Sequence, residues 1–415
     1  MFAKTLETIE SSAPKRALYA RVILAALAIG LVLRTIWFAR WGMGHDRGLV
    51  DFDAFYIVAQ RVWLGDVDQV YQFLKLFDMQ REAGGGDSFM PWTYPPQFDL
   101  LLAPFALVPA SVAYFLFTGA TLGFYIVVLR SIAFSHFALA LVILFPAIEI
   151  TLACGQNGFL TAGLLGLVCL FIDKRPTVAG FALGLMVVKP HLAIAFAVYS
   201  LLTRRWVVVM TAAAVVLASS LLCTAVFGVK IWAGFLQSVH DSSIFLQRAY
   251  YPLFRMISIY AGLRSLELPA AVALLAQVAV AVSALGIIAI ALYRGFPARW
   301  CLGLTAMVSV SISPYAYDYD FLIFGMGLAL LLPELQKFAR EGERAVIYAA
   351  PMIIGAYGNL RSTQVGTSLT ELERTDVLSI GGFALVPLIA LIFMAMLRES
   401  KSETVPHLSM KAEQA

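Results

Sequence analysis

Two aspartates separated by one residue lie shortly after the first long apolar run of the chain, in the segment Val50-Asp51-Phe52-Asp53-Ala54-Phe55-Tyr56. Only 13% of the residues are charged, so acidic side chains beside a hydrophobic segment stand out. A carboxylate next to hydrocarbon is costly unless it faces water or a partner, which makes it a candidate functional group. Asp51 and Asp53 are therefore the first candidates for acid–base chemistry. The alternative is a pair of acids that merely solvate a polar loop.

Lys189 and Arg255 are the candidate cations for binding an anion. Lys189 precedes Pro190 and His191 within an apolar stretch, and the proline interrupts a helix there. A lysine at such a break can bind phosphate as a point charge; a helix-end lysine that reaches the interface is the alternative. His191 is either a further donor or simply a satisfied polar group. Arg255 lies among aromatic and apolar residues, where its planar guanidinium suits phosphate oxygens. Interfacial anchoring is the alternative for Arg255.

Three further motifs place polar side chains between apolar segments. Tyr94 precedes two prolines, whose extended backbone is tolerated at membrane depth only where protein or a water-filled cavity satisfies it. Gln156 lies in a polar break between two apolar runs. Tyr317, Asp318 and Asp320 follow a proline at a helix end, where capping explains one carboxylate but not two among three tyrosines. These acidic and aromatic residues predict contacts with sugar hydroxyls.

The sequence contains no pattern that predicts a metal, a nucleotide or a hydrolytic triad. The four cysteines are scattered singly, without metal-ligand spacing or a disulfide framework. No phosphate-binding glycine loop is present, which argues against an ATP-driven transporter and against a sugar-nucleotide donor. We therefore expect neither a cofactor nor a metal ion.

The composition predicts an all-α, polytopic membrane protein. Of the 415 residues, 60% are hydrophobic, against about 45–50% in soluble domains. Apolar runs of roughly 15–25 residues separated by basic clusters are typical of helical spans and not of a barrel. We expect about 12 spans in one domain over residues 1–397, then a polar cytoplasmic tail at 398–415. The predicted apolar segments lie at about 17–39, 110–130, 132–150, 157–172, 177–203, 206–227, 269–293, 299–313, 321–333, 345–358 and 376–397.

The distribution of basic residues predicts which ends of the spans lie inside. The N-terminus is basic and is therefore placed in the cytoplasm, so residues 40–98 form an external loop with amphipathic helices along the interface. A second external segment is expected at 228–268; its basic character is a local exception to the rule or a sign of anion binding. This topology puts every candidate residue on the outer side of the membrane.

The order of these motifs resembles glycosyltransferase family 87, polytopic transferases of the C-type fold that use polyprenyl-phosphate-linked sugars. The resemblance extends from about residue 45 to 330, and its order and spacing are more specific than any single motif. The motifs that carry it are Asp51-Phe52-Asp53-Ala54-Phe55-Tyr56 with Gly65, Tyr94-Pro95-Pro96 with Leu101-Leu102-Ala103-Pro104, Gly155-Gln156-Asn157-Gly158, Ala179-Gly180, Lys189-Pro190, Arg204-Arg205-Trp206 and Ser313-Pro314-Tyr315.

The resemblance implies an inverting hexosyltransferase, with mannose as the first candidate sugar. It assigns Asp51 as the general base for the acceptor hydroxyl, with Asp53 as the fallback. Lys189 and Arg255, helped by His191 or His240, would neutralise the departing phosphate. Some relatives carry a histidine in the late outer loop, where this chain has Tyr317, Asp318 and Asp320 instead. The sugar-binding candidates implied are Tyr94, Gln156, Tyr317, Asp318 and Asp320.

The implied partners are a polyprenyl-phosphate-sugar donor, a lipid or glycan acceptor and the bilayer, with no nucleic acid. The implied location is the plasma (inner) membrane, with the site facing the periplasm or exterior. A transporter or flippase of lipid-linked sugars is the alternative, since the helix break at Lys189 suits it too. The chain shows no convincing internal repeat, which transporters often have. A third reading is a non-catalytic assembly partner.

Overall fold

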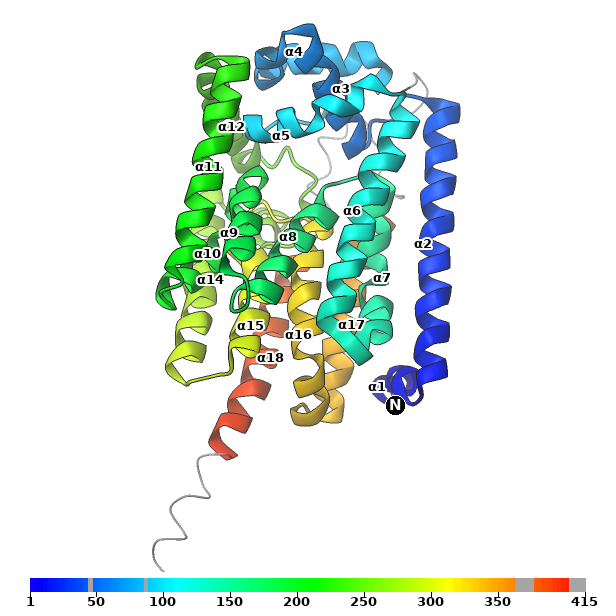
Figure 1. The fold of residues 1–415 in the computed structure, drawn as a ribbon, viewed down its shortest axis with the longest axis vertical. Helices are drawn as coiled ribbons and strands as arrows, with labels where there is room; N and C mark the ends of the chain where they lie inside the picture. Colours follow the sequence, from blue (N-terminus) through cyan, green and yellow to red (C-terminus); the bar gives the residue numbers. More distant parts are fainter. Residues whose placement is uncertain (44–47, 86–88, 363–376, 403–415) are drawn as a thin grey trace, which may run out of the picture.

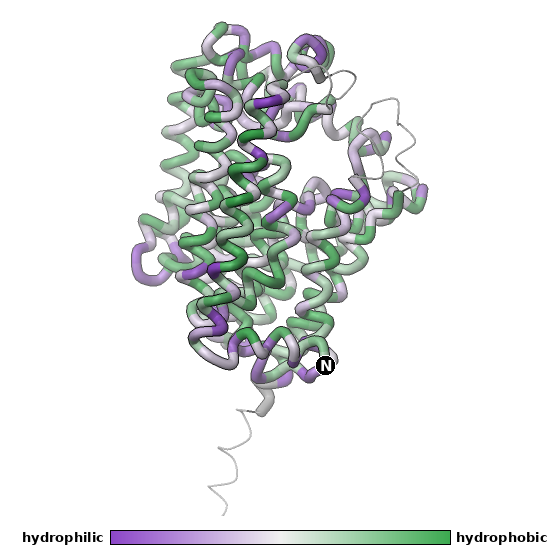
Figure 2. The backbone as a smooth tube through the Cα atoms, turned by 90° about the vertical axis from the view of Figure 1, so that its right-hand side faces the viewer, coloured by the Kyte–Doolittle hydropathy of each residue, from purple (hydrophilic) through white to green (hydrophobic). Residues whose placement is uncertain are grey.

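The computed structural model describes residues 1–43, 48–85, 89–362 and 377–402, and Figure 1 shows their arrangement. This part of the chain is helical, and its one extended pairing is an isolated antiparallel bridge between Met256 and Tyr317. The prediction of an all-α protein is confirmed. Hydrophobic residues fill the middle of the bundle and hydrophilic ones gather towards its ends (Figure 2).

Six segments among the described residues are long and apolar enough to cross a membrane. One of them, Ala110–Cys154, joins two helices. The predicted number of about 12 spans is not confirmed, because the other apolar helices are shorter. The six segments contain α2 (Ala13–Trp41), α6 (Ala110–Ala133) with α7 (Phe137–Cys154), α11 (Trp206–Phe227), α14 (Ala270–Tyr293), α16 (Leu322–Phe338) and α18 (Gly381–Ser402).

Shorter helices complete the bundle, at nearly the positions that the sequence predicts. α18 continues to Ser402 and so extends into the predicted tail, of which residues 403–415 lie outside the described part. The shorter helices are α8 (Gly158–Phe171), α9 (Pro176–Leu185), α10 (Ile194–Leu202) and α15 (Ala298–Ile312). The helix α17 (Glu341–Ser362) is as long as α11 but is not among the six apolar segments.

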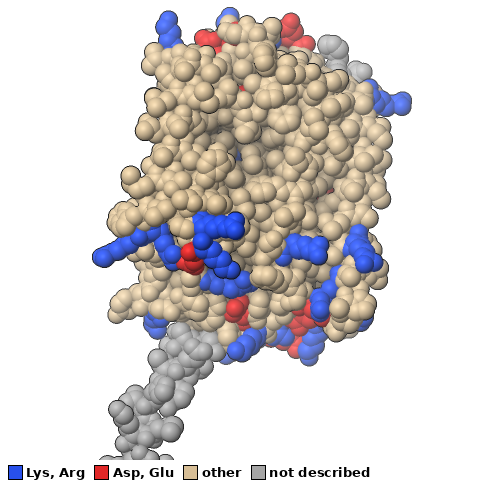
Figure 3. Space-filling view, viewed as in Figure 1, with Lys and Arg blue, Asp and Glu red and all other residues tan. Residues whose placement is uncertain are grey.

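A layer of short helices crosses one end of the bundle, opposite the N-terminal helix α1 (Phe2–Glu7) (Figure 1). Two of them form within the predicted external loop, and α12 and α13 lie within the predicted segment 228–268. Most Lys and Arg side chains visible in Figure 3 gather towards the other end, near α1. The layer contains α3 (Asp51–Leu64), α4 (Phe73–Gln80), α5 (Pro96–Leu102) and α12 (Lys230–Gln247), and α13 spans Ile259–Arg264.

Two backbone breaks bring polar residues into the bundle. Gly155 has φ +66° and ends α7, a left-handed conformation that favours glycine, so that Gln156 leaves the helix before α8 begins. Lys189 has φ −144° and ψ 70° between two 3₁₀ turns, Met186–Val188 and Pro190–Leu192. The following proline disfavours the helical conformation at Lys189. The predicted helix break at this lysine is therefore present.

Candidate active site

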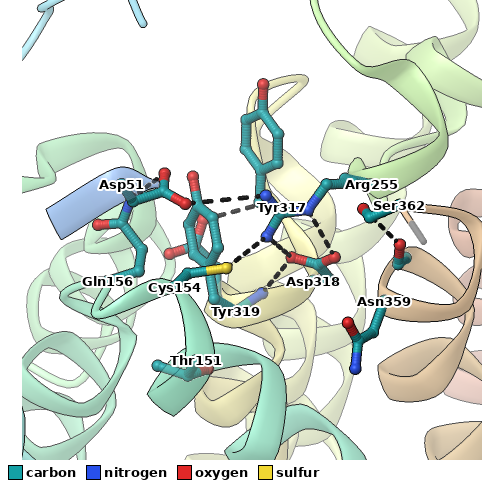
Figure 4. A network of polar contacts seen from close by, with 12 residues as sticks. Asp51, Thr151, Cys154, Gln156, Arg255, Tyr317, Asp318, Tyr319, Asn359 and Ser362 are labelled. Carbon is teal, nitrogen blue, oxygen red and sulfur yellow. Dashed lines mark hydrogen bonds and ion pairs between the residues drawn. The ribbon is translucent and has the colours of Figure 1, made fainter. Parts of the chain in front are cut away.

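Arg255 joins two aspartates that come from opposite ends of the sequence. It ends the 3₁₀ turn Leu253–Arg255 and donates from Nε and Nη2 to the two carboxylate oxygens of Asp318, at 3.1 and 3.0 Å. Its Nη1 lies 3.7 Å from Oδ2 of Asp51, and Nη2 also contacts Sγ of Cys154 at 3.4 Å. Figure 4 shows these four residues facing one another. A fork–fork pair of this kind fixes the plane of the guanidinium.

Gln156 connects Asp51 to Tyr94. Its Nε2 donates to Oδ1 of Asp51 at 2.8 Å, and its Oε1 accepts from the Tyr94 hydroxyl at 2.9 Å. The backbone N–H of Asn157 donates to the same Oε1 at 2.8 Å, which fixes the amide orientation. The Asp51 carboxylate is thus held by Gln156 of the α7–α8 loop and by Arg255.

Lys189 and Asp320 form a second, buried ion pair. Nζ of Lys189 donates to Oδ1 of Asp320 at 2.7 Å, and their side chains are 6% and 1% exposed. Oδ2 of Asp320 accepts from the Tyr317 N–H at 3.1 Å. Lys189 also lies 4.6 Å from the ring centroid of Tyr319, and the Arg255 guanidinium carbon lies 5.6 Å from the same ring. One aromatic ring therefore separates the two ion pairs.

Asp51 differs from the other carboxylates of this cluster in exposure. Its side chain is 18% exposed, whereas that of Asp318 is 1% exposed. Asp53, the fallback base, is fully buried, and its Oδ2 accepts from the Val50 N–H at 2.8 Å, where α3 begins. Such a bond satisfies a free donor at a helix N-terminus. The structure thus places Asp53 in a capping contact and leaves Asp51 accessible.

The two histidines named as helpers occupy different places. His191 follows Lys189 and Pro190, and its Nε2 is buried without a hydrogen bond to the described residues. His240 lies on an exposed face of α12, and no contact within the described part of the chain joins it to the Arg255 cluster. Tyr317 packs on Tyr319 with 5.2 Å between ring centroids and an interplanar angle of 8°. Apart from Asp53 and His240, the predicted residues thus share one polar region.

Family 87 is the family whose sequence model matches this chain, over residues 92–314, which is more than half of its length. The chain belongs to glycosyltransferase family 87. The predicted resemblance is confirmed, and with it the coarse activity of a membrane glycosyltransferase. The matched region contains Tyr94, Gln156, Lys189 and Arg255; Asp51 precedes it.

One solved structure matches this family 87 protein in a structural comparison: ArnT from Cupriavidus metallidurans, bound to undecaprenyl phosphate. The two chains are 14% identical, the match covers 93% of this chain and 78% of ArnT, and the TM-score is 0.36. No curated protein matches the sequence.

Some residues around the site of this family 87 member were not predicted. Cys154 and Asn157 flank Gln156 in the polar break, which is the signal that points to them. Gly358 of α17 packs against Asp318, and no sequence pattern indicates it. The described residues contain no group of three His, Cys, Asp or Glu side chains placed to hold a metal ion.

Gly358 is needed where α17 passes the Arg255–Asp318 pair. A Cβ atom added there would lie far inside van der Waals distance of Oδ2 of Asp318, while one at Gly342 on the same helix would meet nothing within 4 Å. We expect Gly358→Ala to lower the free energy of unfolding by about 1–3 kcal/mol, as overpacking does, and to lower kcat. Thermal unfolding and a transfer assay would measure both; Gly342→Ala is the control, and equal behaviour of the two variants would contradict the contact.

A third buried carboxylate supports the Tyr94 segment. Asp99 of α5 is fully buried, and its oxygens lie 2.9 Å from Nε1 of Trp92 and 2.6 Å from the Tyr71 hydroxyl. The same hydroxyl lies 3.0 Å from the Tyr94 carbonyl. A tyrosine hydroxyl has one hydrogen, so it can donate to the carbonyl and accept from Asp99 only if Asp99 is protonated. Burial raises the pKa of Asp99 to about 7, against the opposing bonds from Tyr71 and Trp92.

Asp99→Asn is expected to change how stability depends on pH. Because the pKa of Asp99 rises from its ordinary 3.8 to about 7 in the folded state, the folded protein binds a proton that the unfolded chain has lost. The stability contributed by Asp99 therefore falls between about pH 4 and 7 and is constant above that range. Asparagine can accept from Trp92 and donate to the Tyr71 hydroxyl, as the protonated carboxyl does, without titrating. Between pH 5 and 7 the unfolding midpoint of the wild type should fall progressively relative to that of Asp99→Asn, and the difference should stay constant from pH 7 to 8. If the midpoints of the two proteins change with pH in parallel, Asp99 is not a neutral carboxyl in the folded state.

Proposed function

We propose that this protein is an inverting hexosyltransferase that moves a sugar, with mannose as the first candidate, from a polyprenyl-phosphate-linked donor to an acceptor hydroxyl. The proposal includes a C-type glycosyltransferase fold and a site on the outer face of the plasma membrane. Membership of family 87 supports the reaction class. The observation that carries the assignment of the base is the accessible Asp51 carboxylate beside Arg255.

Asp51 is the best candidate for the general base. A base must reach the acceptor hydroxyl, and Asp51 is more exposed than either Asp318 or Asp320. The latter two carboxylates hold Arg255 and Lys189 at hydrogen-bond distance. In Asp51, Oδ1 accepts from Gln156 and Oδ2 faces the guanidinium at 3.7 Å, so that Oδ2 is the oxygen to take the proton.

Arg255 is the main candidate for stabilising the leaving phosphate. Its Nε and Nη2 are engaged with Asp318 and Cys154. Nη1 makes an ion pair with Asp51 at 3.7 Å, longer than a hydrogen bond, so its two N–H groups can take a phosphate oxygen. Lys189 is buried against Asp320, and its ammonium lies over the same Tyr319 ring as the Arg255 guanidinium. Preorganised charge of this kind stabilises developing negative charge without reorganisation.

The reaction is a single displacement. The acceptor oxygen forms a bond to the anomeric carbon while the bond from that carbon to the phosphate oxygen breaks. The acceptor proton passes to Asp51, and the bonding electrons leave with polyprenyl phosphate, whose new charge faces Arg255. The anomeric configuration is inverted, so a β-linked donor yields an α-linked product. Tyr94, Gln156, Tyr317, Asp318 and Asp320 surround this path and are proposed to orient the sugar directly or through the two ion pairs.

The charge distribution supports the proposed orientation. Lys and Arg side chains gather at the end of the bundle that carries α1 (Figure 3), and cytoplasmic loops are enriched in these residues. Asp51 begins α3, one of the short helices at the opposite end of the bundle (Figure 1). The site would then face the periplasm or exterior.

The test is a transfer assay with the purified protein in detergent. Polyprenyl-phosphate-mannose and a panel of lipid and glycan acceptors are supplied, and the products are identified by mass spectrometry. A glycosylated acceptor supports the proposal, because a transporter or flippase needs a sealed membrane to show activity and makes no new bond. Transport of the lipid-linked sugar in proteoliposomes without product would favour the transporter instead.

A further inference from the structure

Asn157 is a buried amide that the proposed chemistry does not use. Its side chain is 0% exposed, and neither its Oδ1 nor its Nδ2 has a hydrogen-bond partner within the described part of the chain. Buried polar groups are nearly always paired, because an unpaired one costs about 1–3 kcal/mol. Asn157 therefore has unused capacity for one donor and one acceptor contact.

Helix capping does not explain this residue. Asn157 is the N-cap of the 14-residue helix α8, yet its side chain makes no capping hydrogen bond. Asparagine is among the best N-cap residues because its oxygen accepts from the first turn of the helix. Here only the backbone carbonyl of Asn157 takes part, accepting from the N–H of Thr161 at 3.0 Å. The side-chain amide therefore plays no part in capping its own helix.

The surroundings of Asn157 are those of the active site. Its backbone N–H donates to the Gln156 oxygen that also accepts from Tyr94. The next residue, Gly158, packs so closely on the Tyr319 carbonyl that no Cβ would fit. Asn157 thus directly follows Gln156, the residue that donates to the Asp51 carboxylate.

We propose that the amide of Asn157 binds a hydroxyl group of the donor sugar and so determines which sugars are used. A hydroxyl donates one hydrogen bond and accepts others, which matches the two unused groups of the amide. This inference rests on the proposed glycosyl transfer and names the recognition of its donor.

The test compares polyprenyl-phosphate-mannose with its mono-deoxy analogues, one for each ring hydroxyl in turn. We expect wild-type protein to use one analogue with roughly 10- to 100-fold lower kcat/KM than the parent donor, because removal of that hydroxyl leaves the amide unpaired. Asn157→Ala should use the parent donor and that analogue with similar kcat/KM while still discriminating the others as the wild type does.

Gln97→Ala is the matched control. Gln97 is a second buried amide with an unpartnered Oε1 among the described residues, but its Nε2 donates to Ser220 of α11, outside the site. Its replacement should change kcat/KM by the same factor for every donor. Asn157→Ser serves if Asn157→Ala does not fold, and it should reduce the discrimination against the one analogue.

The outcomes separate this inference from the proposed function. Absence of product from wild type with every donor counts against glycosyl transfer. Product formation without discrimination by the wild type, or discrimination that is unchanged in the Asn157 variants, overturns the sugar contact and leaves an amide that binds water. A uniform loss of kcat/KM for all donors in Asn157→Ala overturns it as well.

Discussion

Replacing Asp51 by asparagine is expected to lower kcat by roughly 10²–10⁴-fold, the usual contribution of a positioned base. Asparagine retains the shape of aspartate and can still accept from Nε2 of Gln156, as Oδ1 does at 2.8 Å, but it cannot take a proton from the acceptor. The ion pair with Arg255 at 3.7 Å is long and partly exposed, so we expect little change in stability. Initial rates at saturating donor and the thermal unfolding midpoint measure the two effects.

Asp53→Asn is the control for this prediction, since it changes the second acid of the same motif. The Asp53 carboxylate is fully buried and accepts from the N–H of Val50. Its replacement should lower the free energy of unfolding by about 1 kcal/mol, as loss of a helix cap does, with a much smaller effect on kcat. Full turnover in Asp51→Asn, or a larger loss of kcat in Asp53→Asn, would mean that the base is assigned to the wrong residue.

Arg255→Met is expected to be the most destabilising of these substitutions and to abolish transfer. It would leave the Asp318 carboxylate, 1% exposed, without its bidentate partner. Breaking one side of a buried ion pair typically costs about 3–5 kcal/mol. The same change removes the guanidinium that faces Asp51 and, in our proposal, the leaving phosphate. Denaturant or thermal unfolding in detergent and the transfer assay would report the two losses.

A second substitution separates the fold from the chemistry at Arg255. Arg255→Met combined with Asp318→Asn also removes the unpaired carboxylate of Asp318, so stability should largely return while transfer activity does not. Arg264→Met is the matched control, because Arg264 donates to the carbonyls of Leu268 and Gln247 and not to a carboxylate. Recovery of transfer together with stability in the double variant would contradict a role of Arg255 in the reaction.

Local residue patterns were sufficient to predict where the chain leaves the helical conformation. Pro190 predicts the break at Lys189, and the polar run around Gly155 predicts the break between α7 and α8, because both effects act on adjacent backbone. The partners of the polar side chains at these breaks were not predictable. Asp320 lies 131 positions from Lys189, and no spacing rule relates two residues that meet only when distant helices pack.

The two acids of the opening motif show the same limit. The two-residue spacing of Asp51 and Asp53 does not show which of them is the base and which is the helix cap, because that depends on where the helix starts. The structure begins α3 at Asp51, and side chains two apart in a helix point to different faces. Asp51 then faces Arg255, while Asp53 turns back to the N–H of Val50. Tertiary packing decided the roles of two residues with the same chemistry.

The two ion pairs on either side of Tyr319 constrain how this protein can diverge. Each cation is matched to its own carboxylate, Lys189 to Asp320 and Arg255 to Asp318. Replacing only the cation or only the carboxylate of a pair leaves an unpaired buried charge, whereas replacing both together does not. Homologous sequences that lack one of these residues should therefore lack or exchange its partner as well, and such correlated substitution would mark the pairs as inherited units.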